Sequence, residues 1–319
     1  MIFIFDPTFS IIKWWNWSCL CESIGSTRMR SGFALQFELS QYIGQFATRV
    51  FLHQRRRKNA RAVKFDICLW TQYWLSFTHP QKSPGFEKEF TSKLVSELRG
   101  EFASQTFTTH RADMSNREET QGLITSVLAA HKQRHDSIAI LVLNAGLARR
   151  IRDIEEISLQ DWDDVIQVNC TSPFVLLKHS LDDLGGKMRK ARWGRIILIG
   201  SISSRGGGIN GCHYAASKGA LCSMGMNLAR VLAPDNITVN CISPALIGDT
   251  GMVPAVQPPS QDLSSNDQPH TQSDIGTVLA STIPLGRLGH PSEVANVVLM
   301  LAKTGYMTGQ EIVLGGGLH

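Results

Sequence analysis

Short apolar runs alternate with segments of helical length from about residue 88 to the C-terminus, and this alternation restricts the fold more than any other feature. Ile138–Leu143 and Ile196–Ile199 are apolar throughout. Strands buried on both faces have such continuous apolar sequences, and they occur in parallel sheets that helices cover on both sides. The pattern therefore predicts an α/β fold in which a doubly wound parallel sheet forms a single domain.

Caps, prolines and apolar periodicity predict the remaining elements. We expect helices over 86–102, from a capping box at Ser115–Glu118 through Ala130, from Ser158 with a bend near Asn169 and Pro173, from Tyr214 to near Pro234, and after Pro291. We expect strands over 106–111, 138–143, 195–200, 237–242 and 310–314. Residues 251–282 are rich in Pro, Ser, Gln and Asp, which is typical of an irregular insertion.

Tyr214 and Lys218 are four residues apart on one expected helix, thirteen residues after Ser201. Positions i and i+4 share a helix face, so the phenol and the ammonium point the same way. A nearby ammonium favours phenolate, so we expect the pKa of Tyr214 to fall below its usual value of about 10. Such a tyrosine serves as a general acid or base for a carbonyl/alcohol pair, whereas the alternative is a solvated helical pair. Ser201 follows a buried strand, where open α/β sheets bind ligands.

Further motifs, in the same order along the chain, resemble the short-chain dehydrogenase/reductase superfamily. They are Asn144-Ala145-Gly146 after an apolar strand, Asn169 in Val-Ile-Gln-Val-Asn, Ser243-Pro244-Ala245 leading to Thr250, and the C-terminal segments 283–295 and 306–310. The 3-oxoacyl-[acyl-carrier-protein] reductase branch is the most similar, and the resemblance covers residues 88–319. It implies a Rossmann-like fold and NAD(P)-dependent oxidoreductase chemistry.

The resemblance implies a catalytic tetrad of Ser201, Tyr214, Lys218 and Asn169. Ser201 would hydrogen-bond the substrate carbonyl, and Lys218 would bind the ribose hydroxyls and lower the pKa of Tyr214. Asn169 would hold a water that relays protons to Lys218, or it could simply relieve a kink in its helix. The resemblance requires no group at His213, which we interpret as pocket lining or surface.

The same resemblance assigns cofactor contacts besides Tyr214 and Lys218. Asn144, Ala145 and Gly146 would form the wall under the adenosine half, although the motif could be an ordinary turn. Asp113 would contact the adenine or, alternatively, cap the following helix. The segment from Pro244 to Thr250 would close over the nicotinamide, with Ala245 in place of the usual glycine, and residues 251–282 would form a substrate lid or a plain surface insertion.

The N-terminal part of the chain departs from the family's Thr-Gly-x-x-x-Gly-x-Gly loop, whose glycines let the backbone approach a pyrophosphate. Gly25-Ser-Thr-Arg28 and Gly32 flank Met29-Arg30-Ser31, with one residue too many. Residues 1–80 carry a net charge of +6 and five of the seven Trp, while the remainder carries −1. We therefore divide the chain into a divergent segment, 1–22, and a Rossmann-type domain, 23–319. The divergent sequence is either an incorrectly spliced segment or a genuine extension.

The choice of cofactor depends on basic residues in this part of the chain. Val50–Arg57 resembles a second strand ending in arginines, where Arg55 would meet a 2′-phosphate. Arg28 in the loop remnant also favours a 2′-phosphate. No acidic residue follows that strand to bind the free 2′-hydroxyl of NAD. NADP is therefore favoured over NAD, the alternative being a solvated basic run.

Seven cysteines occur without Cys-x-x-Cys pairs or His/Cys ligand spacing, so we expect neither a metal site nor a disulfide framework. A reducing, cytoplasmic location follows, since no basic n-region precedes the apolar N-terminus and no run has the roughly 18–20 apolar residues of a spanning helix. One short basic run without interleaved aromatics argues against nucleic-acid binding.

The leading hypothesis is an NADP-dependent oxidoreductase that interconverts a ketone, of 3-oxoacyl or related type, and a secondary alcohol. One alternative is an NAD-dependent dehydrogenase of a polyol or sterol-type alcohol, because the fold does not select the substrate. Another is a catalytically impaired binding protein, which the altered glycine loop favours. Long helices over 158–188 and 214–233 resemble those through which relatives pair, implying a homodimer or homotetramer.

Overall fold

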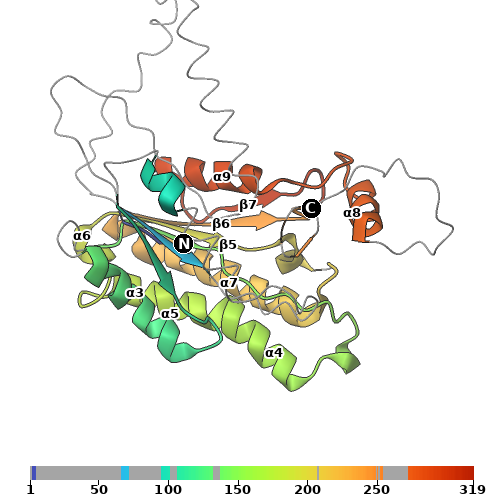
Figure 1. Cartoon of the computed structure of the whole chain (residues 1–319), viewed down its shortest axis with the longest axis horizontal. Coiled ribbons are helices and arrows are strands. Elements are labelled where there is room, and N and C mark those ends of the chain that lie inside the picture. The colour runs from blue at the N-terminus through green and yellow to red at the C-terminus, as the bar shows by residue number, and fades with distance from the viewer. Residues whose placement is uncertain are drawn as a thin grey trace, which may run out of the picture.

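The computed structural model describes residues 2–4, 66–71, 95–100, 106–131, 137–206, 208–248, 250, 252–253 and 272–319. Within them, seven strands form one sheet in the order β3-β2-β1-β4-β5-β6-β7 (Figure 1). The strands are β1 (Ile2–Ile4), β2 (Asp66–Thr71), β3 (Thr106–Arg111), β4 (Ile140–Leu143), β5 (Gly194–Ile199), β6 (Ile237–Pro244) and β7 (Glu311–Leu314). The helices are α3 (Arg117–His131), α4 (Leu159–Ile166), α5 (Ser172–Leu181), α6 (Met188–Ala191), α7 (Gly211–Leu232), α8 (Gln272–Ser281) and α9 (Pro291–Lys303).

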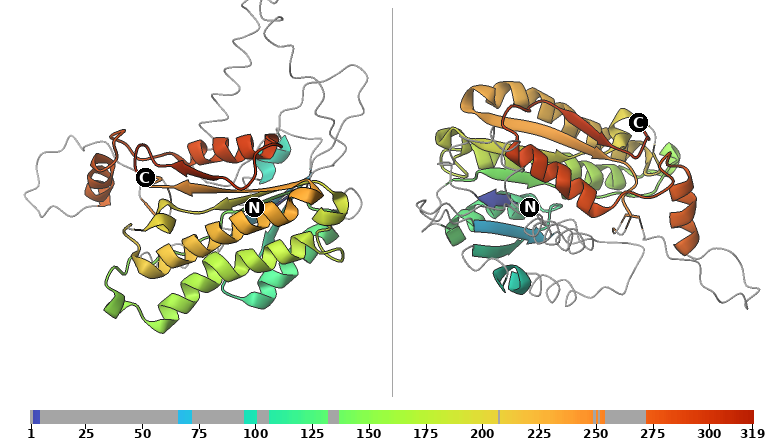
Figure 2. Two further views of the ribbon diagram at one scale, coloured as in Figure 1. Left: turned by 180° about the vertical axis from the view of Figure 1, so that it is seen from behind. Right: turned by 90° about the horizontal axis from the view of Figure 1, so that it is seen from above.

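Helices cover both faces of the sheet, which confirms the doubly wound, Rossmann-like fold. α3, α5 and α7 pack on one face, and α9 and helical residues 95–100 pack on the other (Figures 1 and 2). Successive residues of the central strands point to opposite cores. Leu141 and Leu198 belong to the core under α3, α5 and α7, whereas Ile140 and Ile197 belong to the core under α9. β4 and the Ile196–Ile199 part of β5 are apolar throughout because both of their faces are buried.

β1 differs in direction from the other strands of the described sheet. β2 pairs in parallel with β3, and β4, β5, β6 and β7 are parallel throughout. β1 pairs antiparallel with both of its neighbours, with Ile2 opposite Cys68 in β2 and Leu141 in β4. The carboxyl end of β1 therefore lies at the sheet edge opposite to the carboxyl ends of β4, β5 and β6. Ile2–Ile4 belongs to the segment that the sequence set apart, 1–22, yet it pairs in the middle of the sheet.

The strand beside β3 is not the one that the sequence predicted. Asp66–Thr71 fills the position that the resemblance gave to Val50–Arg57, and it pairs with β3 from Asp66–Thr106 to Thr71–Arg111. Ile-Cys-Leu-Trp within this strand carries no charge, whereas the 50–57 run ends in three arginines, and a strand between two neighbours favours the apolar sequence. Residues 50–57 lie outside the described residues, so the strand next to β3 does not end in Arg55.

Side-chain caps fix where the helices begin. Asn116 caps α3, because its Oδ1 accepts hydrogen bonds from the backbone N–H of Glu118 at 2.9 Å and of Glu119 at 3.2 Å. The cap therefore lies one residue after the predicted Ser115, whose hydroxyl donates to Asp113 instead. The predicted start at Ser158 is confirmed, since its side chain accepts from Asp161 N at 3.1 Å.

The long helix that begins after Ser158 changes its winding at the predicted place. α4 ends at Ile166, a π-helical segment spans Gln167–Thr171, and α5 continues from Ser172. A π turn inserts one extra residue into the helix and re-aims the side chains around it, and such turns are frequent at functional sites. Asn169 lies inside this segment and is fully buried.

Only part of the irregular insertion 251–282 is described. It contains α8, which extends away from the sheet in Figure 1, while residues 254–271 lie outside the described part. No helix in the described part is long and apolar enough to span a bilayer.

Candidate active site

Ser201 lies where β5 leaves the sheet. Gly200 follows the strand, and its N–H donates to Ile242 O at 2.7 Å, which carries the strand pairing one residue further. Ser201 is 8% exposed, and its Oγ accepts from Ser203 N at 3.2 Å at the start of a 3₁₀ turn, Ile202–Arg205. The structure thus places this hydroxyl at the carboxyl edge of the sheet, as the sequence predicts.

Tyr214 and Lys218 lie on the buried face of α7, close to Ser201. Tyr214 is 4% exposed, and Ser201 is near enough to affect the pKa of its phenol. Lys218 is 2% exposed; its Nζ donates to Ile199 O at 2.8 Å and lies 5.9 Å from the centroid of the Tyr214 ring. An ammonium has three donors, so the contact with Ile199 leaves capacity for the hydroxyls of a ligand.

Burial determines the acidity of both groups. It raises the pKa of Tyr214 to about 12, and the nearby Ser201 opposes this shift only in part. It lowers the pKa of Lys218 to about 8, because an ammonium loses hydration in the interior. The expectation that Lys218 lowers the pKa of Tyr214 is therefore wrong for the ligand-free protein, where desolvation dominates. At neutral pH the tyrosine is a phenol and the lysine is mostly an ammonium.

Asn169 connects the loop after β4 to α7. Its Oδ1 accepts from Leu147 N at 2.7 Å, and its Nδ2 donates to Leu147 O at 2.8 Å and to Ser217 Oγ at 2.9 Å. Ser217 in turn donates to Tyr214 O at 2.7 Å. This chain of contacts fixes the loop against the helix that carries the tyrosine. The proposed water relay through Asn169 stays a prediction.

The Asn144–Gly146 motif lies next to this network. It follows β4, with Gly146 buried and Asn144 exposed. A Cβ built at Gly146 would lie 3.2 Å from Lys218 Nζ and 3.5 Å from Asn169 Oδ1. A side chain here would crowd the lysine, so glycine leaves room for the buried ammonium. The structure thus brings Gly146, Asn169 and Lys218 together, a proximity of Gly146 to Lys218 that the motifs did not predict.

Asp113 and Thr250 make local contacts. Asp113 Oδ1 accepts from both Ser115 N and Ser115 Oγ at 2.8 Å, so it shapes the turn before α3. The alternative role, a cap on this helix, is wrong because Asn116 is the cap. Pro244 ends β6 in a buried position. Thr250 Oγ1 donates to Ile247 O at 3.0 Å, which folds the segment after Pro244 back on itself. The cofactor roles of all three stay predictions.

This edge of the sheet suits one half of a nicotinamide dinucleotide better than the other half. The ends of β4 and β5 supply a glycine and a hydroxyl, and the buried face of α7 supplies a phenol and an ammonium to the same cluster. The predicted phosphate-loop residues Gly25 and Arg28, and Arg55, lie outside the described residues. The antiparallel β1 does not deliver a following loop to this edge, because its carboxyl end is at the other one. The cluster thus fits the ribose and nicotinamide half, while the adenosine contacts of Asp113 and Asn144–Gly146 stay predictions.

His213 is buried, so of our two interpretations the surface one is wrong. Neither of its ring nitrogens has a hydrogen-bond partner among the described residues, and burial lowers the pKa of the imidazole. The ring is thus a neutral, apolar packing group beside Tyr214.

Ser217 is the residue that the sequence analysis missed. Its position within Tyr214-Ala-Ala-Ser-Lys218, on the buried helix face, was the available signal.

Known proteins resemble the chain along most of its described length. The profile of a family described as enoyl-(acyl carrier protein) reductase matches residues 86–319. A 3-oxoacyl-[acyl-carrier-protein] reductase of Aquifex aeolicus is 37% identical over 185 residues, 57% of this chain and 66% of the relative. An acetoacetyl-CoA reductase of Cupriavidus necator is 32% identical over 190 residues, 59% of this chain and 69% of the relative. A solved structure of NAD+-bound xylitol dehydrogenase has a TM-score of 0.59 at 25% identity, covering 72% of this chain and 85% of that chain.

A doubly wound sheet with a serine, a tyrosine and a lysine at its carboxyl edge defines a Rossmann-type oxidoreductase. More narrowly, the chain belongs to the short-chain dehydrogenase/reductase family of NAD(P)-dependent enzymes. The matched residues, 86–319, coincide with the stretch over which the sequence motifs resemble that family.

Proposed function

We propose that the protein is an NADP-dependent reductase that converts a 3-oxoacyl thioester into the corresponding 3-hydroxyacyl thioester, or catalyses the reverse reaction. The observation that carries the proposal is the buried cluster of Ser201, Tyr214 and Lys218 at the carboxyl edge of the sheet. The printed activities of the two reductases above, on acyl-carrier-protein and coenzyme A thioesters, support the substrate class. The likeness to xylitol dehydrogenase supports the alternative that the protein is an NAD-dependent alcohol dehydrogenase.

Each residue of the cluster has a definite task in this reaction. Bound NADPH supplies the hydride from its nicotinamide. Ser201 donates a hydrogen bond to the carbonyl oxygen and holds it beside Tyr214. Because the pKa of Tyr214 is about 12, its phenol carries a proton at neutral pH and donates it to that oxygen. The Lys218 ammonium then stabilises the phenolate that remains.

An assay on the full chain tests the proposal. Acetoacetyl-CoA and NADPH, with NADH in a parallel reaction, should yield 3-hydroxybutyryl-CoA and oxidised cofactor. Faster oxidation of NADPH than of NADH is the expected result. Turnover with a polyol and NAD but not with the thioester would replace the proposal with the dehydrogenase alternative.

The lysine predicts a pH dependence of the reductase. Because burial lowers the pKa of Lys218 to about 8, the ammonium is lost as pH rises through that value, while Tyr214 stays protonated until about 12. The rate of carbonyl reduction at saturating substrate should therefore fall above about pH 8, by up to about tenfold per unit. Initial rates measured from about pH 7 to about pH 10 give the profile. A rate that stays level across this range would contradict the role of Lys218.

A second candidate function is a binding protein that keeps the fold without turnover. The antiparallel direction of β1 favours it, because the family's phosphate loop leaves from the carboxyl edge of a central parallel strand. Binding of NADPH and of acetoacetyl-CoA, followed by intrinsic tryptophan fluorescence, separates the candidates. Thioester binding without cofactor binding would support the second.

We further propose a homodimer or homotetramer in a reducing, cytoplasmic location. Phe174 on α5 is 53% exposed and Val231 on α7 is 49% exposed, so each of the two helices through which relatives pair has an apolar side chain available to a partner. We expect light scattering to give at least twice the chain mass, and Phe174→Glu to shift the protein towards the monomer. A wild-type monomer at micromolar concentration would contradict this prediction.

A further inference from the structure

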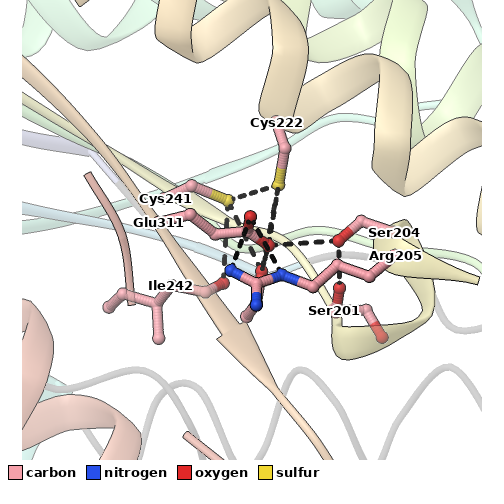
Figure 3. Close-up of polar contacts among 8 residues, drawn as sticks. Ser201, Ser204, Arg205, Cys222, Cys241, Ile242 and Glu311 are labelled. Carbon is pink, nitrogen blue, oxygen red and sulfur yellow. Dashed lines mark hydrogen bonds and ion pairs between the residues drawn. The ribbon is translucent and has the colours of Figure 1, made fainter. Parts of the chain in front are cut away.

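Two thiols lie against each other behind the strand that carries Ser201. Cys222 lies on α7, one helical turn after Lys218, and Cys241 lies in β6. Their sulfur atoms are 2.7 Å apart, and both side chains are buried (Figure 3). Packed carbon atoms ordinarily stay about 3.5–4.0 Å apart, while a disulfide bond is about 2.05 Å long. The two free thiols are therefore nearer to bonding distance than to ordinary packing distance.

The backbone around the pair leaves room for the sulfurs and holds them in place. A Cβ built at Gly200 would lie 2.7 Å from Cys241 Sγ and 2.9 Å from Cys222 Sγ, so the thiols occupy the space that a larger residue would fill. Strand pairing between β5 and β6 fixes Cys241 opposite Leu198. A bond between the sulfurs would thus need little movement of α7 relative to the sheet.

The surroundings distinguish the two thiols chemically. The hydrogen bond between the two thiols lowers the pKa of Cys222 and raises the pKa of Cys241. The two cysteines raise the pKa of Lys218 against the larger, opposite effect of burial. Cys222 is therefore the thiol that loses its proton first and the better nucleophile.

The negative charge of Glu311 repels a thiolate at Cys222, but the carboxylate is largely neutralised by other hydrogen bonds and an ion pair. Its Oε1 accepts from Ser243 Oγ at 2.6 Å and from Ser204 Oγ at 3.1 Å. Its Oε2 pairs with Arg205 at 3.1 Å (Figure 3). Cys222 Sγ donates a long, weak hydrogen bond to Oε1 at 3.9 Å. These interactions reduce the repulsion that a bare carboxylate would impose on the sulfur.

We propose that Cys222 and Cys241 form a redox-active dithiol that hydrogen peroxide converts into an intramolecular disulfide. The Cys222 thiolate attacks one peroxide oxygen, the O–O bond breaks, and the released hydroxide takes up a proton as water. The Cys241 thiol then attacks the resulting sulfenic sulfur. The S–S bond forms, the S–O bond breaks, and a second water leaves with the Cys241 proton. Together the thiols lose two electrons and the peroxide gains two.

Both sulfurs are buried, so the oxidant must be small, and hydrogen peroxide meets that condition. The bond ties α7, which carries Tyr214 and Lys218, to β6, whose end carries Pro244. Small thiol reductants reverse it by exchange. Such reversible disulfides are compatible with a reducing compartment, unlike a structural disulfide framework.

Peptide mapping of the full chain tests the proposal. The protein is exposed to hydrogen peroxide, its remaining thiols are alkylated, and trypsin cuts after Lys218 and Arg230, which separates Cys222 on peptide 219–230 from Cys241 on peptide 231–287. The expected product is these two peptides linked, lighter by two hydrogens, and released by dithiothreitol. The oxidised protein should also unfold at a temperature higher by about 5 °C, because the cross-link restricts the unfolded chain.

Cysteine variants provide the controls. Cys222→Ser and Cys241→Ser should each abolish the linked peptides and the rise in unfolding temperature, whereas Cys212→Ser, which removes an exposed thiol, should keep both. The mapping of the wild-type protein decides the matter even if a variant fails to fold. Alkylation of both Cys222 and Cys241 after peroxide has oxidised Cys212 would overturn the proposal. Sulfinic acid at Cys222 without linked peptides would overturn it equally.

Discussion

Tyr214→Phe should reduce the turnover of acetoacetyl-CoA at least about 100-fold, the scale on which positioned general acids contribute. The substitution removes one oxygen from a side chain that is 4% exposed and leaves the ring in its place. The proton donor is lost while the fold is kept, since phenylalanine needs no partner for the missing hydroxyl. The loss should fall on kcat, because the phenol acts on the transition state rather than on ground-state binding.

Tyr306 offers a matched control for this experiment. It is fully exposed after α9, so Tyr306→Phe removes the same oxygen away from the site. This variant should keep wild-type kcat and KM. Circular dichroism and thermal unfolding of both variants separate a chemical effect from a folding defect. Near-wild-type turnover in Tyr214→Phe would show that another group supplies the proton.

The sequence predicted best those features that depend on local pattern. The strand Thr106–Arg111 and the helix start after Ser158 match the structure because their signals, a run of Thr and Phe with high strand propensity and a capping serine, act over a few residues. Ser201, Tyr214 and Lys218 were also predictable. Parallel strands bring their carboxyl ends to one edge, and helical spacing fixes which side chains of α7 face that edge.

Features that depend on long-range packing were not predictable from local pattern. Three residues, Ile2–Ile4, fill a central position in the sheet, and so short a strand carries no signal for its direction. The acidity of Tyr214 was predicted from its neighbour Lys218, but burial by distant parts of the chain outweighs that charge. The pairing of Cys222 with Cys241 joins residues 19 positions apart through the packing of a helix on a strand.

Residues 29–32 should have a large effect on the affinity of the chain for NADP. Met29, Arg30 and Ser31 place side chains where the family's loop has glycines, and non-glycine residues tolerate positive φ poorly. Anion binding at a helix N-terminus needs free amides and a close approach of the backbone. Arg28 and Arg30 recover little of the lost affinity, because screened charges contribute weakly. The chain should therefore bind NADP poorly despite its complete catalytic cluster.

Replacement of Met29–Gly32 by Gly-Ile-Gly restores the family's glycine spacing and removes the extra residue. The repaired protein should bind NADP at least about tenfold more tightly by calorimetry, equivalent to about 1.4 kcal/mol. Ala-Ile-Ala at the same place is the matched control, since it corrects the length without the glycines, and it should gain little. Equal affinity in the original and repaired chains would contradict the prediction. In that case the loop remnant suffices for the phosphates, and the antiparallel β1 is compatible with cofactor binding.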